Sequence, residues 1–276
     1  MMEGGAYAPS HPPKDMMMLD SFETIEDALH DGVLVVTINR PERKNALMQS
    51  MYLRLAQLLT RANTEEDIRS VLLYGGEEVF CAGNDIREFA AARPPEEAED
   101  ETRPSTQFMN AVLELRKPLL AAVNGPAVGV GATLLLHCDL VFAGHNAHIL
   151  FPFVRLGLCP EFGSSMLLGR IVGQRRAMQL LLSGGGCRAE QALAWGLVNE
   201  LIEPSMTFAR ALEAAKEISG LPPAAVATTK DLMLSSGAAE VRDQIVRERV
   251  AFKRLLGDPA AQEIFKNFLD KSKSKS

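Results

Sequence analysis

The sequence contains few aromatic residues and no long apolar run. Phe, Trp and Tyr make up 6% of the 276 residues, and only one of them is tryptophan. No basic run is interleaved with aromatic side chains, which argues against nucleic acid as a partner. No stretch reaches the roughly 20 apolar residues of a transmembrane helix. We therefore expect neither a nucleic-acid partner nor a membrane partner.

Cysteine is also scarce, and the spacing of the four cysteines excludes the common metal and redox motifs. They are Cys81, Cys138, Cys159 and Cys187, with no CxxC pair among them. Reduced, buried thiols in an intracellular protein are expected. His145 and His148 have no third ligand at suitable spacing, so no metal site is predicted.

The two ends of the chain differ in composition from its middle. Residues 1–24 begin without the positive charge and apolar run of a secretory signal, and their Gly, Pro and Ser content predicts a disordered leader. The tail Lys271–Ser276 is basic, and we interpret it as a solubilising end. It closes with Ser-Lys-Ser and not with the Ser-Lys-Leu of peroxisomal import, so a cytoplasmic location is expected.

Short β-branched runs alternate with helical spacings over residues 33–143. The predicted strands are Leu34–Asn39, Val71–Tyr74, Leu119–Val123 and Leu140–Ala143. The predicted helices between and after them are Ala46–Ala62, Ser105–Arg116 and Ala132–His137. Strands separated by helices imply right-handed crossovers and a largely parallel sheet. The fold class is therefore α/β.

From Gly163 onward the pattern becomes helical. The predicted helices are Ser164–Val172, Gln174–Leu182, Ala189–Ala194, Met206–Ser219, Pro223–Leu234, Glu240–Leu256 and Pro259–Lys271. Prolines mark several starts and glycines several ends. These patterns predict a core over residues 25–200, followed by a helical region over residues 201–276.

Two glycine-bearing loops each follow a predicted strand. In Phe80–Ile86 (FCAGNDI), Gly83 can adopt a conformation that exposes the N–H of Asn84. In Asn124–Gly131 (NGPAVGVG), the start of the next helix offers unpaired N–H groups. Each loop alone is a weak signal, either a simple turn or a phosphate cradle, and neither Walker A nor GxGxxG is present. Together, two N–H donors aimed at one thioester oxygen would stabilise an enolate.

Five segments, taken in order, resemble the enoyl-CoA hydratase/isomerase (crotonase) family. They are NRPERKNAL at 39–47, FCAGNDI at 80–86, AAVNGPAVGVGATLLLHCDLVFAG at 121–144, FPFVRLGLCPEFGSS at 151–165 and AEQALAWGLV at 189–198. The resemblance extends over about residues 25–270. Within the family, the sequence is most similar to the peroxisomal-type Δ3,Δ2-enoyl-CoA isomerases. It implies a crotonase spiral of β-β-α turns closed by a helical trimerisation region, in a homotrimer or hexamer.

The resemblance also implies a site. The backbone N–H groups of Asn84 and Val130 would form the oxyanion hole, and Lys44 would lie near the phosphates of coenzyme A. A solvated lysine at a helix start is the alternative for Lys44. The remaining residues implied in CoA and substrate binding are Ala82, Gly83, Asn84, Asp85, Ile86 and Gly129. No cofactor is implied apart from the coenzyme A of the substrate.

The acids of the site depart from the family's hydratases. By the resemblance, the two hydratase glutamates correspond to Thr133 and Phe153, neither of which can act as a general acid or base, so hydration is disfavoured. Glu161 has a position similar to the acid of the Δ3,Δ2-enoyl-CoA isomerases. The alternative for Glu161 is a carboxylate favoured by the dipole of the following helix. Burial would raise the pKa of Glu161 and make it a better base.

The leading hypothesis is an enoyl-CoA isomerase of fatty-acid β-oxidation with Glu161 as its catalytic residue. The alternatives are another crotonase reaction, such as hydration, hydrolysis or decarboxylation, and a non-catalytic acyl-CoA-binding module. Among other polar residues, His137 and Cys138 are expected in the core, and Asp85 is expected to shape its loop. Cys159 has no histidine partner that would support a nucleophilic role.

Overall fold

The computed structural model describes residues 24–91 and 102–273. The expected leader lies outside these residues apart from residue 24, and so do the last three residues of the basic tail. Within the described part, no helix combines the length and the apolar character needed to cross a membrane.

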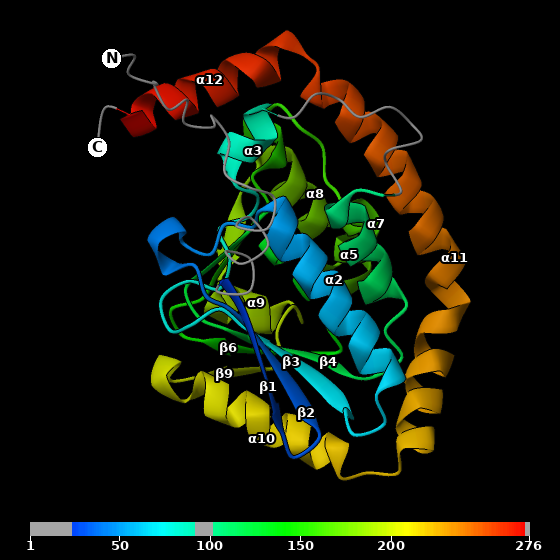
Figure 1. The fold of residues 1–276 in the computed structure, drawn as a ribbon. Coiled ribbons are helices and arrows are strands. Elements are labelled where there is room, and N and C mark those ends of the chain that lie inside the picture. The colour runs from blue at the N-terminus through cyan, green and yellow to red at the C-terminus, as the bar shows by residue number, and fades with distance from the viewer. Residues whose placement is uncertain (1–23, 92–101, 274–276) are drawn as a thin grey trace, which may run out of the picture.

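A six-stranded sheet forms the centre of the molecule (Figure 1), in the order β1-β2-β3-β4-β6-β9. The strands are β1 (Ile25–His30), β2 (Val33–Ile38), β3 (Ser70–Tyr74), β4 (Leu119–Val123), β6 (Leu140–Gly144) and β9 (Glu200–Ile202). β1 pairs antiparallel with β2, and the other neighbouring pairs are parallel. The predicted, largely parallel sheet is confirmed.

A second sheet has three short strands, β5 (Pro126–Val128), β7 (His148–Leu150) and β8 (Gly186–Arg188). β4, β5 and helix α6 (Val130–Leu135) follow one another as one β-β-α turn. β6, β7 and the short helix η2 (Phe153–Leu156) form the next. This repetition is the spiral of β-β-α turns that the family resemblance implied.

The central strands are buried on both faces because helices cover each side of the sheet. Val33, Val35 and Leu72 pack with Ala211 of α10 (Thr207–Ser219). The alternate residues of the same strands pack on the other side, in the core that also holds α2 (Gln49–Thr64) and α5 (Pro104–Leu113). Figure 1 shows α10 on one side of the sheet and α2 and α5 on the other. Burial on both faces explains the uninterrupted apolar runs of these strands.

The C-terminal helices are α7 (Ser164–Val172), α8 (Gln174–Ser183), α9 (Ala189–Ala194), α11 (Pro223–Leu256) and α12 (Pro259–Lys273). α7 and α9 have the predicted bounds. The two predicted helices Pro223–Leu234 and Glu240–Leu256 are one helix of 34 residues, so that prediction is wrong. Gly237 lies in its middle, and the cost of a helical glycine, about 1 kcal/mol relative to alanine, does not break the helix.

Three further expectations need correction. The chain after Gly163 is not entirely helical, because β8 and β9 form there, and β9 pairs with β6 of the central sheet. α2 begins at Gln49 and not at Ala46, because Leu47 forms a parallel bridge with Asn84 and Met48, the N-cap, has an extended backbone. α6 spans Val130–Leu135 and not Ala132–His137, since it begins directly after Gly129.

Candidate active site

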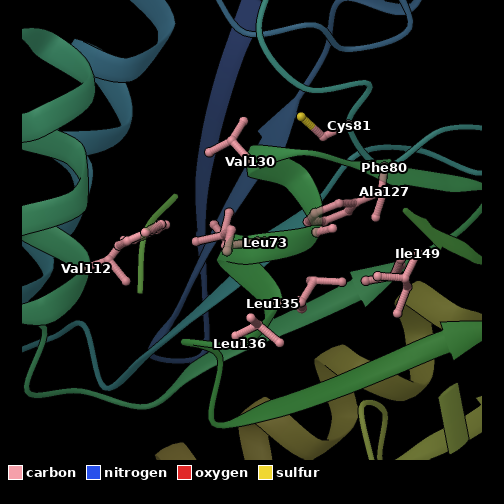
Figure 2. Close-up of a cluster of buried hydrophobic side chains, with 14 of the residues drawn as sticks. Leu73, Phe80, Cys81, Val112, Ala127, Val130, Leu135, Leu136 and Ile149 are labelled. Carbon is pink, nitrogen blue, oxygen red and sulfur yellow. The ribbon is translucent and has the colours of Figure 1, made fainter. Parts of the chain in front are cut away.

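The two glycine-bearing loops predicted from the sequence lie against each other. The N–H of Val128 donates to the carbonyl of Cys81 at 2.8 Å, and Cys81 and Ala127 form an isolated parallel bridge. A Cβ placed on Gly129 would lie 4.0 Å from the Cα of Gly83. Figure 2 shows Phe80 and Cys81 of one loop close to Ala127 of the other. Segments more than 40 residues apart therefore meet through their backbones.

The N–H groups of Asn84 and Val130 form no hydrogen bond with the residues that the structure describes. Asn84 follows Gly83, whose φ is +94° and whose Cβ, if present, would lie 3.0 Å from the carbonyl oxygen of Val128. Val130 opens α6 directly after Gly129, whose φ is +55°. Two unpaired donors on adjoining loops are what an oxyanion hole requires.

The loop before α2 runs alongside the Asn84 loop. The N–H of Ala82 donates to the carbonyl of Lys44 at 3.0 Å, and the N–H of Leu47 donates to the carbonyl of Gly83 at 2.8 Å. The Lys44 side chain is exposed. Ile86 begins the short helix α3 (Ile86–Ala91). The predicted CoA-binding residues from Lys44 to Ile86 therefore come together at one edge of the site.

Two buried polar residues that the sequence analysis missed hold these loops. Asn45 donates through Nδ2 to the carbonyls of Gly75 at 2.5 Å and Val79 at 2.8 Å. Its Oδ1 accepts the N–H of Arg40 at 2.8 Å. The guanidinium of Arg40 in turn donates to Asp85 at 3.0 Å. The left-handed position of Asn45, which suits asparagine, is a signal that the sequence contained but that local spacing did not reveal.

Asp85 shapes its loop, as expected. Its Oδ1 accepts the N–H of Arg87 at 3.1 Å, and its carboxylate pairs with Arg40 and Arg87. Burial acts to raise the pKa of Asp85, but the hydrogen bonds from Arg87 and Arg40 outweigh it, so that the pKa is lowered overall. An ionised, paired carboxylate is a poor base, which leaves Asp85 a structural role.

A cavity of about 280 Å³ opens beside the Asn84 loop. Its wall includes Tyr52 of α2, Met109 of α5, Ile245 and Phe252 of α11, and the Asn84 and Glu161 side chains. Val130 lies 1% exposed in the core and is not part of this wall. The cavity therefore brings together one of the two predicted oxyanion residues and the predicted catalytic acid.

Glu161 is a half-buried acid whose carboxyl has no hydrogen-bond partner among the described residues. Its Oε1 is inaccessible to solvent and accepts no hydrogen bond from any described residue. Burial raises the pKa of Glu161 to about 7, and the negative charge of Glu248 adds to the rise. The N-cap of α7 is Gly163, so the alternative role of Glu161 as a carboxylate at the helix start is not supported. An unpaired acid that titrates near neutrality is suited to proton transfer.

The backbone after Glu161 is strained. Phe162 has a φ of +59° and Gly163 a φ of +73°. A left-handed phenylalanine is uncommon, and such strain concentrates at functional sites. The carbonyl of Phe162 lies 2.8 Å from Nε2 of His137, whose ring stacks on the phenylalanine with centroids 4.0 Å apart.

His137 fixes this strained residue from the turn that follows α6. Burial lowers the pKa of His137 to about 4, so the ring is neutral at physiological pH. Since a carbonyl oxygen only accepts, the bond to Phe162 places the ring proton on Nε2. His137 thus has the packing role expected from its position. Through its bond to Phe162 it also connects the turn after α6 to the turn that carries Glu161.

Tyr52 is a site residue that the sequence analysis missed. It is 1% exposed, and its hydroxyl donates to Oδ1 of Asn84 at 2.6 Å. Burial, and then the negative charge of Glu161, raise its pKa well above the ordinary value, so the hydroxyl stays protonated. Its ring packs on Phe108 with centroids 5.4 Å apart. Tyr52 thereby fixes the side chain of Asn84. In the predicted site, the backbone N–H of Asn84 is one of the two oxyanion donors.

The two positions that correspond to the hydratase glutamates are part of the core. Thr133 is 0% exposed and Phe153 is 4% exposed, and neither belongs to the cavity wall. The four cysteines are unpaired thiols, and burial raises the pKa of Cys81 to about 12 and of Cys159 to about 11. Two further acids, Asp85 and Glu88, line the cavity, but Asp85 is paired with arginines and Glu88 accepts the N–H of Gln49. Within the described part of the chain, Glu161 is therefore the unpartnered acid of the cavity wall.

Comparison with known proteins identifies the family. The model of the family described as Enoyl-CoA hydratase/isomerase matches residues 28–275. The 1,2-epoxyphenylacetyl-CoA isomerase of Escherichia coli (strain K12) is 34% identical over 86% of this chain and 92% of its own length. The 2,3-dehydroadipyl-CoA hydratase of the same organism is 34% identical over 87% of this chain and 92% of its own length.

Solved structures give the same result. OdaA of Pseudomonas aeruginosa superposes with a TM-score of 0.85 at 43% identity, over 89% of this chain and 98% of its own. An enoyl-CoA hydratase/isomerase from Pseudoalteromonas atlantica T6c superposes with a TM-score of 0.85 at 40% identity, over 90% of this chain and 97% of its own. The chain therefore belongs to the enoyl-CoA hydratase/isomerase (crotonase) family and is an acyl-CoA enzyme of that family.

Proposed function

We propose that the chain is a Δ3,Δ2-enoyl-CoA isomerase of fatty-acid β-oxidation, with Glu161 as its catalytic residue. The observation that carries the proposal is the unpartnered Glu161 carboxyl, which lines the same cavity as Asn84 and has a pKa raised to about 7. Thr133 and Phe153 supply no second acid. One carboxyl group is sufficient to shift a double bond by two proton transfers.

In this mechanism the Glu161 carboxylate removes a proton from C2 of a 3-enoyl-CoA. The electron pair of the broken C–H bond delocalises onto the thioester oxygen, where the N–H groups of Asn84 and Val130 stabilise the dienolate. The protonated Glu161 then returns the proton to C4, the double bond forms between C2 and C3, and the thioester carbonyl is restored. With a pKa near 7, Glu161 reaches both protonation states at neutral pH.

The same proposal assigns coenzyme A to the edge of the site. The segment from Ala82 to Ile86, together with Gly129, would hold its adenine and pantetheine largely through backbone groups. Lys44, exposed beside Ala82, would meet its phosphates. The mechanism uses no resident cofactor, since the thioester itself provides the electron sink.

We also propose a homotrimer or hexamer. Large apolar side chains remain exposed on α8 and α11, which supports burial against further copies of the chain. The most exposed of these residues are Leu182 at 68%, Leu232 at 71%, Met233 at 76% and Val250 at 68%. Sedimentation of the purified protein tests this, and a monomer at micromolar concentration would contradict it.

A hydratase is the second candidate function. It is favoured by the 2,3-dehydroadipyl-CoA hydratase of Escherichia coli, which is as similar to this chain as the epoxyphenylacetyl-CoA isomerase. Against it stand the buried Thr133 and Phe153, because adding water needs a group to activate it.

Two substrates given to the wild-type protein separate the candidates. We expect conversion of 3-hexenoyl-CoA to the 2-enoyl product, and hydration of 2-hexenoyl-CoA at a rate at least tenfold lower. Faster hydration than isomerisation would overturn the proposal in favour of a hydratase. Tight binding of both esters with no conversion would favour a non-catalytic module.

A further inference from the structure

Glu248 is a buried acid of α11 that the proposed mechanism does not use. It is 5% exposed, although α11 lies at the edge of the molecule (Figure 1). Its Oε2 accepts the N–H of Gly163 at 2.6 Å, and its Oε1 accepts the N–H of Ser165 at 2.9 Å. The hydroxyl of Ser165 also donates to Oε1. A buried carboxylate with three donors is a fixed structural element.

These bonds place Glu248 at the N-terminus of α7. Gly163 is the N-cap of that helix, and Ser165 is its second residue. The first N–H groups of a helix have no partner within it, and a negative charge there is stabilised by the helix dipole. Glu248 thus supplies the capping oxygens that Gly163, which has no side chain, lacks. Gln244, one turn earlier on α11, donates to the Ser165 hydroxyl at 2.8 Å and strengthens the attachment.

The capped segment is the strained turn that carries Glu161. Phe162, between Glu161 and Gly163, has a left-handed backbone that persists only if its surroundings hold it. His137 holds the Phe162 carbonyl from the turn after α6, and Glu248 holds the Gly163 N–H from α11. The turn is therefore fixed on both sides of its strained residue by side chains that come from distant parts of the chain.

We propose that Glu248 is a positioning residue for Glu161: by holding Gly163 and Ser165 it keeps the 161–163 turn in the conformation that directs the Glu161 carboxyl into the Asn84 cavity. This inference rests on the proposed function, because it concerns the placement of the proposed base. A displacement of about 1 Å at a reacting group costs roughly 100-fold in rate. Loss of the cap is therefore expected to reduce turnover more than binding.

The charge of Glu248 has a second, smaller consequence. It adds to the effect of burial in raising the pKa of Glu161. Tyr52 also faces Glu161. The charged side chains that line the cavity besides Glu161 are Asp85, Glu88, Arg103, Arg249 and Lys253. Neutralising Glu248 alone leaves all of these groups unchanged, so a shift in the pH profile of the variant reports on Glu248.

The test compares Glu248→Gln and Glu248→Ala with Glu240→Gln. Glu240 is an exposed acid of the same helix, paired with Arg170 on the surface, and serves as the matched control. We expect kcat for 3-hexenoyl-CoA to fall roughly 100-fold in Glu248→Ala and about tenfold in Glu248→Gln, which keeps one carbonyl acceptor. KM should change less than threefold, and Glu240→Gln should match the wild type.

The pH profile separates positioning from a purely structural role. In Glu248→Gln the acid limb of the kcat profile should move to lower pH, because the neighbouring negative charge no longer raises the pKa of Glu161. A variant with lowered melting temperature but unchanged kcat and pH profile would show Glu248 to be structural only and would overturn the proposal.

Amide hydrogen exchange distinguishes failure of this inference from failure of the proposed function. We expect faster exchange at Gly163 and Ser165 in Glu248→Gln than in Glu240→Gln, whatever reaction the enzyme catalyses. If the wild type does not isomerise 3-hexenoyl-CoA but this difference is found, the function is wrong and the cap is real. Equal exchange in the two variants would overturn the positioning role directly.

Discussion

The two halves of the site are held in different ways. The oxyanion loops are bonded to each other and to the loop before α2 through backbone groups, such as Val128 N–H to Cys81 and Leu47 N–H to Gly83. The side chains of Asn45 and Arg40 add further bonds to them. The Glu161 turn is fixed by the side chains of His137 and Glu248, which come from other elements. Because one fold can host different reactions, the side chains of the site decide the reaction more than the backbone fold does. Relatives at the same 34% identity to this chain bear both hydratase and isomerase names.

A large effect is expected in the half that is held by the backbone. Gly83→Ala would force a side chain into a left-handed position, 3.0 Å from the carbonyl of Val128, and turn the Asn84 N–H away. Loss of one oxyanion donor lowers kcat by roughly 10²–10³-fold. Gly173→Ala is the control, since it has a similar φ of +83° but no atom within 4 Å of the added Cβ. Equal kcat in the two variants would disprove the role of the Asn84 loop.

A smaller effect is expected in the half that is held by side chains. His137→Phe keeps an aromatic ring against Phe162 but removes the donor to its carbonyl. An unsatisfied buried carbonyl costs about 1–3 kcal/mol of unfolding free energy. We expect kcat to fall about tenfold through displacement of Glu161. Denaturant unfolding and steady-state kinetics measure both quantities, and wild-type values of both would mean that the turn does not need this bond.

The same division describes what the sequence predicted. The Asn84 and Val130 loops were identified because glycine spacing after a strand is a local pattern, and α7 and α9 were placed with their observed bounds. The three-residue strands β5, β7 and β8 are too short to show alternation. The 34-residue α11 was divided because Ser-Ser-Gly resembles a helix end.

The side chains that hold Glu161 were not predictable as a group, because they are distant in sequence. Glu248 had one usable signal: it lies seven residues after Val241 and three after Ile245, on the buried face of α11. An acid in an apolar stripe needs a buried partner, but the sequence does not say which. Tyr52 stands likewise in the apolar stripe of α2, and its bond to Asn84 appears only in the folded chain.

The raised pKa of Glu161 predicts that this residue lowers the free energy of unfolding at alkaline pH. A folded pKa near 7 exceeds the unfolded value of 4.5, so the folded state binds more protons and stability falls as pH rises through this window. Glu161→Gln should therefore raise the unfolding free energy at pH 8 by on the order of 1–3 kcal/mol, allowing for solvent screening, and by much less at pH 5. Denaturant titrations at the two pH values measure this gain. A gain of the same size at both would rule out titration of Glu161 as its source.

The smallest effect on kcat/KM is expected at Tyr52, which contacts Asn84 and also faces Glu161. Tyr52→Phe keeps the ring on Phe108 and removes only the hydroxyl that donates to Asn84. One hydrogen bond contributes about 0.5–1.5 kcal/mol, so a two- to tenfold loss in kcat/KM is expected. A loss as large as that of Gly83→Ala would mean that the hydroxyl takes part in the reaction itself.

Turnover of 3-hexenoyl-CoA by Glu161→Gln tests the central claim most directly. Loss of a general acid-base group lowers kcat by roughly 10²–10⁴-fold, and binding of the CoA ester should persist. Glu88→Gln is the matched control, because Glu88 is an acid of the same cavity wall whose carboxylate accepts the N–H of Gln49 at 2.8 Å. The account predicts a nearly inactive Glu161→Gln and an active Glu88→Gln. Near-normal isomerisation by Glu161→Gln would contradict it.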